Sequence, residues 1–89
     1  AERLLGNLKL AKDCFKKSLE IFQEINSEAH SWIFRGLGDI AFEESDFTAS
    51  RDYYHQSLSL ATKANNKTDC ARSFEKLGQV EYMLGNENN

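Results

Sequence analysis

Residues 34–58 read FRGLGDIAFEESDFTASRDYYHQSL, and two parts of this stretch recur elsewhere in the 89-residue chain. The Leu-Gly pair at 37–38 returns at 77–78, which is 40 positions later. The pattern S-x3-Y-x2-S-L at 50–58 has an earlier counterpart, A-x3-F-x2-S-L, at 11–19. A fixed period of about 40 residues is typical of solenoids, whose units bury their apolar faces only by stacking on neighbours.

Helix-ending signals separate the repeated parts. The chain has no proline, so its helices must end at Gly, Asn, Asp or Ser. One turn signal occurs three times, as LGN at 5–7, ESD at 44–46 and LGN at 84–86, and Asn65-Asn66 marks a further break. In the first turn, glycine suits the end of one helix and asparagine the cap of the next. Asp46 and Asn66 are likewise good N-caps.

Apolar residues at steps of three and four predict four helices between these signals. We expect them at 8–25, 29–41, 47–61 and 71–84, with Asn26-Ser27 as the break after the first. Residues 1–5 look like the stub of an earlier helix that ends at the first turn, and Gly85-Asn86 ends the last one. No segment alternates as a strand does. The expected class is therefore all-α, built of antiparallel helices joined by short turns.

These motifs resemble the tetratricopeptide repeat (TPR) over almost the whole chain. In that repeat, helix A carries a large apolar residue and Leu-Gly, and helix B carries small-x3-aromatic-x2-small. The resemblance implies one right-handed α-solenoid fragment over 1–89, made of a half repeat (1–26), a full repeat (27–65) and the next helix A (66–85). Small residues at Gly38, Gly78, Ser50 and Ser57 allow the helices to approach closely, while Phe34, Tyr54 and Phe74 fill the remaining gap.

The chain departs from the usual 34-residue unit of this family. The extra residues fall at 22–30 and 61–70, so the helices should be about one turn longer. Units of this length look like those of cell-polarity scaffolds and of arrays attached to NTPase-type regulators. Glu81 stands at a position where the family has an aromatic or small residue, which argues against full burial of the last helix.

Composition narrows the function classes. The net charge is −3 with both signs scattered, so no basic patch for nucleic acid exists, and no apolar run is long enough to span a membrane. Cys14 and Cys70 are too isolated for a metal site, and we expect both to be buried, small apolar residues that fit a reducing cytoplasm. The chain lacks an initial Met and looks like a piece of a longer protein.

The resemblance places a ligand groove on the concave face of the helices A. Carried over by position, its residues are Trp32, Arg35, Asp39 and Glu43, followed by Arg72, Lys76 (or Glu75), Gln79 and Tyr82. Aromatic and arginine side chains suit peptide ligands because they give the most energy per contact. Alternatively, these residues are solvated charges and Trp32 packs under the longer loop. Arg72 and Lys76 partly resemble a clamp for a peptide carboxylate, although Asp39 would repel one.

Three function classes follow. The first is a non-catalytic, protein- or peptide-binding scaffold module, and the second is a structural or self-association segment. The third is an enzyme, which no constellation supports: His30 and His55 lie on different helices without acidic partners, and no cofactor or metal motif is present. Both ends should expose apolar residues, so the chain is expected to dimerise or to stack end to end. These residues include Leu8, Phe15, Phe74 and Leu84.

Overall fold

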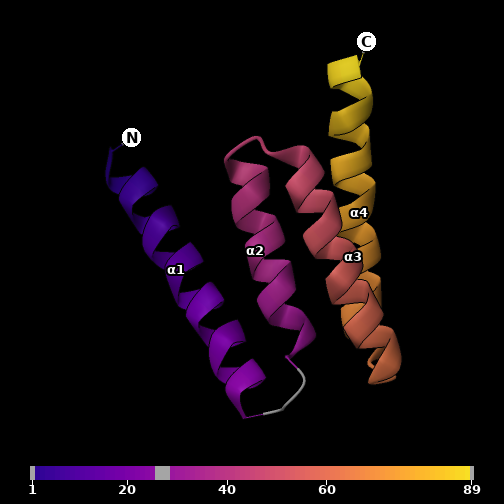
Figure 1. Ribbon diagram of the computed structural model, residues 1–89. Coiled ribbons are helices and arrows are strands. Elements are labelled where there is room, and N and C mark those ends of the chain that lie inside the picture. The colour runs from indigo at the N-terminus through magenta and orange to yellow at the C-terminus, as the bar shows by residue number, and fades with distance from the viewer. Residues whose placement is uncertain (1, 26–28, 89) are drawn as a thin grey trace.

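Four antiparallel helices follow one another in the computed structural model, which describes residues 2–25 and 29–88 (Figure 1). They are α1 (Glu2–Glu24), α2 (Ser31–Glu43), α3 (Phe47–Lys63) and α4 (Lys67–Asn88). No strand occurs among the described residues. The predicted all-α class is confirmed, and so are the positions of the two central helices to within a few residues.

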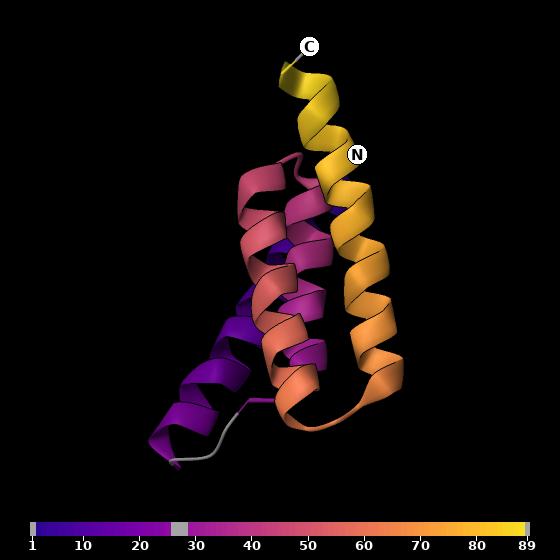
Figure 2. The same ribbon diagram turned by 90° about the vertical axis from the view of Figure 1, so that its right-hand side faces the viewer.

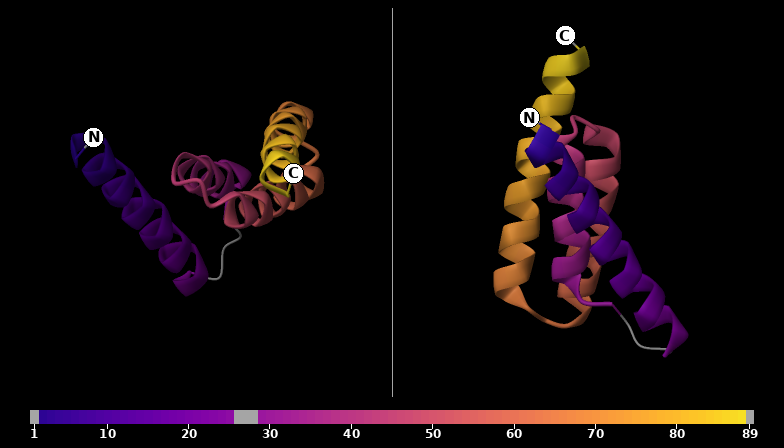
Figure 3. Two further views of the ribbon diagram at one scale, coloured as in Figure 1. Left: turned by 90° about the horizontal axis from the view of Figure 1, so that it is seen from above. Right: turned by 90° about the vertical axis from the view of Figure 1, so that its left-hand side faces the viewer.

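The helices α2, α3 and α4 form the packed part of the molecule (Figure 2). α3 lies against both α2 and α4, and the latter two run in the same direction beside each other. Among the described helices, α1 contacts only α2, and it diverges from the other three along its length (Figure 3). The core therefore belongs to α2–α4.

Buried apolar side chains come from each of these three helices. The most buried are Ile33, Leu37, Ile40, Ala41, Phe47, Tyr54, Ala61, Leu77 and Val80. The predicted apolar face of α2 is thus confirmed. On α4, Ser73, Leu77 and Val80 are buried, whereas Phe74 is 63% exposed, as expected for an apolar residue at that end of the chain.

The turns at 44–46 and 65–66 have the predicted geometry. Ser45 and Asn65 adopt positive φ angles of 61° and 54°, the left-handed conformation that ends a helix. The Asp46 carboxylate then accepts a hydrogen bond from the Ala49 amide at 3.3 Å. The Asn66 Oδ1 accepts one from the Asp69 amide at 3.1 Å. Each turn therefore combines a left-handed residue with an N-cap.

The two LGN turns predicted at 5–7 and 84–86 are wrong. α1 continues through Gly6-Asn7, and α4 continues through Gly85-Asn86 to Asn88. Residues 2–5 are accordingly part of α1 rather than the stub of a separate helix. A glycine inside a helix costs only about 1 kcal/mol, so it does not end a helix unless packing favours the reversal. The predicted break at Asn26-Ser27 lies outside the described residues.

The expected burial of both cysteines is also wrong. Cys14 is exposed on α1, and Cys70 is only partly buried near the start of α4. The Cys70 sulfur lies 3.7 Å from the Thr62 hydroxyl. Cys14 is exposed because α1 has a neighbouring helix on one side only.

Helices α2 and α3 approach each other closely at Gly38. A Cβ atom placed on Gly38 would lie 2.5 Å from Cε1 of the buried Tyr54 ring. The Ser50 hydroxyl donates a hydrogen bond to the Gly38 carbonyl at 2.8 Å. The Ser57 and Ser73 hydroxyls, 3.1 Å apart, form the equivalent close contact between α3 and α4. The role predicted for the small residues is confirmed at Gly38, Ser50 and Ser57.

Gly78 lacks the close helix contact that Gly38 makes, although both glycines follow a leucine at the same position of the repeat. No atom of the described residues lies within 4 Å of a Cβ placed on Gly78, apart from its own helix backbone and chain neighbours. A close contact was instead found at Gly36, where a Cβ would meet the Phe15 ring of α1. This contact was not predicted from the sequence.

The contrast between the two glycines gives a matched test. Gly38→Gln should destabilise the fold by about 1–3 kcal/mol or more, because the Tyr54 ring is buried and has no room to shift. Gly78→Gln should be neutral or stabilising by up to about 1 kcal/mol, since glutamine favours helix and nothing is displaced. Urea unfolding of both variants measures the difference. Equal destabilisation by the two substitutions would contradict the packing described for Gly38.

Candidate functional site

Several side chains of α2 and α4 face each other across the space between these helices. Lys76 lies 3.2 Å from the Asp39 carboxylate, and the Tyr54 hydroxyl donates a hydrogen bond of 2.6 Å to the same group. Asp39 therefore joins α2 to both α3 and α4. Because of this pairing, Asp39 and Lys76 largely neutralise each other's charge.

A pocket of about 280 Å³ opens beside this pair. It is lined by Asp39, Phe42, Glu43, Tyr54, Lys76 and Gln79. Glu43 and Gln79 are exposed at its rim, whereas Tyr54 is buried at its base. The pocket thus offers an aromatic face, a carboxylate and an amide within one small space.

Arg35 has a structural partner. One of its guanidinium nitrogens lies 3.3 Å from the Asp69 carboxylate, and the two side chains are only 15% and 18% exposed. That nitrogen is buried and donates no hydrogen bond. Asp69 also accepts a 2.7 Å hydrogen bond from the Ser31 hydroxyl. These contacts tie the start of α4 to α2.

Two shifted pKa values accompany these contacts. The hydrogen bond from Ser31, followed by the positive charge of Arg35, lowers the pKa of Asp69 below its usual value. Burial, followed by the hydrogen bond to Asp39, raises the pKa of the Tyr54 hydroxyl. Tyr54 therefore stays protonated and Asp69 stays ionised near neutral pH.

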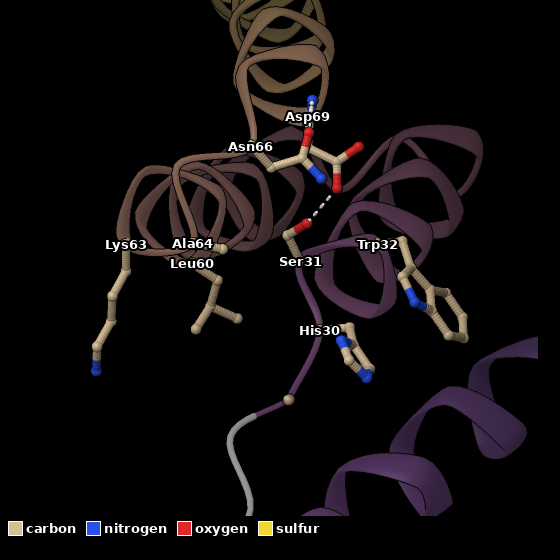
Figure 4. A pocket seen from close by; sticks show the side chains of 9 residues that line it. His30, Ser31, Trp32, Leu60, Lys63, Ala64, Asn66 and Asp69 are labelled. Carbon is tan, nitrogen blue, oxygen red and sulfur yellow. Dashed lines mark hydrogen bonds between the residues drawn. The ribbon is translucent and has the colours of Figure 1, made fainter.

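A larger pocket, of about 460 Å³, lies where α2 and α4 begin and α3 ends (Figure 4). His30 and Trp32 lie on one side of it, and Leu60 and Lys63 on the other, with the Ser31–Asp69 hydrogen bond between them. Trp32 stacks on His30 and makes an edge contact with Phe15 of α1 at a centroid distance of 6.2 Å. Trp32 is nevertheless about half exposed.

The structure divides the eight residues predicted for the groove into groups. Asp39, Glu43, Lys76 and Gln79 share the smaller pocket. Trp32 lines the larger one, Arg35 is paired with Asp69, and the exposed Arg72 and Tyr82 line neither of these two pockets. Glu75, the alternative to Lys76, is exposed.

Sequence reasoning missed Phe42 and Tyr54 as lining residues. Phe42 lies one helical turn after Asp39, so the spacing could have suggested it. Tyr54 was assigned to the core by its repeat position, and it serves both the core and the pocket. His30 and His55 are both exposed; His30 precedes α2, and His55 lies within α3.

Comparisons of the chain with models of protein families, with curated proteins and with solved structures found no match. None of the described helices combines the length and the apolar character needed to cross a lipid bilayer.

The lowered pKa of Asp69 predicts a pH dependence of stability. Its ionised form is favoured in the folded state, so its contribution is present above the unfolded pKa of about 3.9 and is lost as the pH falls through the lower folded value. Asp69→Asn should therefore destabilise the fold at pH 7 by about 1 kcal/mol or more and should reduce the loss of stability on acidification.

Urea unfolding at pH 7 and at pH 3 measures this effect. Asp52→Asn, at an exposed position of α3, is the matched control. It should leave the free energy of unfolding at pH 7 and at pH 3 nearly unchanged. If the stability of Asp69→Asn depends on pH in the same way as that of the parent chain, then ionised Asp69 does not stabilise the fold as described.

Proposed function

We propose that this chain is a non-catalytic protein- or peptide-binding module that takes its partner into the groove between α2 and α4. One observation carries the proposal: four residues selected by repeat position alone line one pocket with Phe42 and Tyr54. They are Asp39, Glu43, Lys76 and Gln79. Residues of α2, α3 and α4 line this pocket, so a ligand in it would contact consecutive units.

The proposal includes a TPR-like architecture of the long-repeat type. In this interpretation α2 and α3 form one complete unit, α1 is helix B of the unit before it, and α4 is helix A of the unit after it. The Gly38–Tyr54 contact and the Ser50 hydrogen bond support this assignment, since they lie at the small and aromatic positions of the repeat. A right-handed solenoid follows from the same assignment.

The chemistry of the pocket suits a peptide. Phe42 offers an apolar surface, and the exposed amide of Gln79 can both donate and accept hydrogen bonds with a peptide backbone. The Asp39–Lys76 ion pair and the hydrogen bond from Tyr54 to Asp39 connect the helices that line the pocket before any ligand arrives. A site that is ordered in advance loses less entropy on binding.

The same pairing bears on the carboxylate-clamp hypothesis. Lys76 already lies against Asp39, so it has little net charge to offer a peptide C-terminus. We therefore propose recognition of an internal peptide segment, without a cofactor, metal, nucleic acid or membrane. The exposed thiol of Cys14 suits a reducing compartment, and we propose the cytoplasm.

Display of random peptides against the chain tests the proposal. Enriched peptides should bind measurably by calorimetry, and the double variant E43A/Q79A should weaken binding about tenfold or more. Both residues are exposed, so the thermal midpoint should not change. The control is D52A/Q56A, which removes similar groups from exposed positions on α3.

Arg35 is unsuited to this test because it pairs with Asp69, and its loss would mix effects on stability and binding. Amidating the C-terminus of a selected peptide separates the two binding modes: affinity should not change for an internal segment. Absence of any enriched peptide, or equal affinity for E43A/Q79A and the parent, would contradict the proposed groove.

A further inference from the structure

The pocket between α2 and α4 carries a net negative charge. Of the described residues that line it, Asp39 and Glu43 are anionic and Lys76 is cationic. The Lys76 ammonium lies 3.2 Å from Oδ1 of Asp39, so its charge is compensated by that carboxylate. Glu43 is exposed and forms no ion pair within the described part of the chain. One negative charge is therefore left over at the rim of the pocket.

The end of α2 adds to the negative potential. α2 ends at Glu43, and its last turn contains no basic residue. The C-terminal end of a helix carries a partial negative charge and favours cations. Asp39 lies one turn before Glu43 on the same face of α2, a spacing at which two carboxylates repel each other. Lys76 is placed against Asp39, so a second cation beside Glu43 would relieve this repulsion.

Asp39 keeps a hydrogen-bond acceptor for a ligand. The Tyr54 hydroxyl and the Lys76 ammonium both lie at Oδ1, at 2.6 and 3.2 Å. Among the described residues no hydrogen bond reaches Oδ2, and the Asp39 side chain is 46% exposed. The Glu43 carboxylate and the side-chain carbonyl of Gln79 are further acceptors in the same lining. The pocket therefore presents several acceptors to a ligand that is rich in donors.

The charges of both carboxylates also act at the base of the pocket. Burial, followed by the hydrogen bond to Asp39 and the charge of that residue, raises the pKa of the Tyr54 hydroxyl. The charge of Glu43 raises this pKa further. A cation that enters the pocket is thus attracted at its base as well as at its rim.

We propose that this pocket receives the side chain of an arginine from the bound peptide. The inference rests on the proposed peptide-binding function and names the residue that the groove selects. A guanidinium group holds five N–H donors in a planar fork, so it can bridge Glu43 and Oδ2 of Asp39. Its plane also suits the ring of Phe42. The ammonium of lysine is a compact point charge and matches this set of acceptors less well.

A titration with a single amino acid tests the pocket without any peptide. Nα-acetyl-arginine amide should shift the backbone amide NMR signals of Phe42, Glu43 and Gln79, with a Kd in the range of about 1 mM or weaker. Nα-acetyl-citrulline amide has a similar shape without the charge and should leave these signals in place. Glu43→Gln should weaken arginine binding about tenfold or more. Glu24→Gln removes the same charge from an exposed position on α1 and should bind as the parent does.

Substitutions in a peptide selected by display give the second measurement. Replacing its arginine by citrulline should lower the affinity about tenfold or more, and replacing it by lysine should have a smaller effect. In Glu43→Gln the difference between the arginine and citrulline peptides should largely disappear.

The two measurements separate this inference from the proposed function. Selected peptides that bind the groove but lose no affinity with citrulline would overturn the arginine pocket and leave the peptide-binding function intact. Equal affinity for arginine and lysine peptides would overturn the choice of arginine. Binding of Nα-acetyl-arginine amide at Glu43 without any enriched peptide would support the pocket and contradict the peptide-binding function.

Discussion

The Tyr54 ring on the bare backbone of Gly38 is the contact on which the rest of the structure depends. It sets the distance between α2 and α3, and at this distance Ser50 reaches the Gly38 carbonyl. The Tyr54 hydroxyl then reaches Asp39, and Asp39 in turn holds Lys76 of α4. A single aromatic side chain therefore connects the packing of one helix pair to the position of the third helix and to the pocket between them.

The success of the turn predictions depended on what surrounds each turn. The signals at 44–46 and 65–66 correspond to real turns because a left-handed residue and an N-cap occur where two helices also pack against each other. The LGN triplets at 5–7 and 84–86 have equally good local chemistry, yet the helices continue through them. Local signals permit a reversal of the chain, but the packing that makes the reversal favourable involves residues distant in sequence.

In the candidate site, too, local sequence spacing predicted part of the arrangement, and contacts between distant residues decided the rest. The repeat position was enough to select Asp39, Glu43, Lys76 and Gln79, because side chains at helical spacing share a face whatever their neighbours are. It did not indicate which cation pairs with which carboxylate. Those choices depend on the offset between α2 and α4, so Arg35 was expected in the groove and instead pairs with Asp69.

The two sides of α4 differ in chemistry because their positions in the repeat differ. Residues that face α2 are polar and paired, such as Asp69 and Lys76, since they meet charged groups across a narrow space. The uncovered side carries Phe74 and Gly78, which stand where Phe34 and Gly38 of α2 meet α3, together with the exposed carboxylates of Glu75 and Glu81.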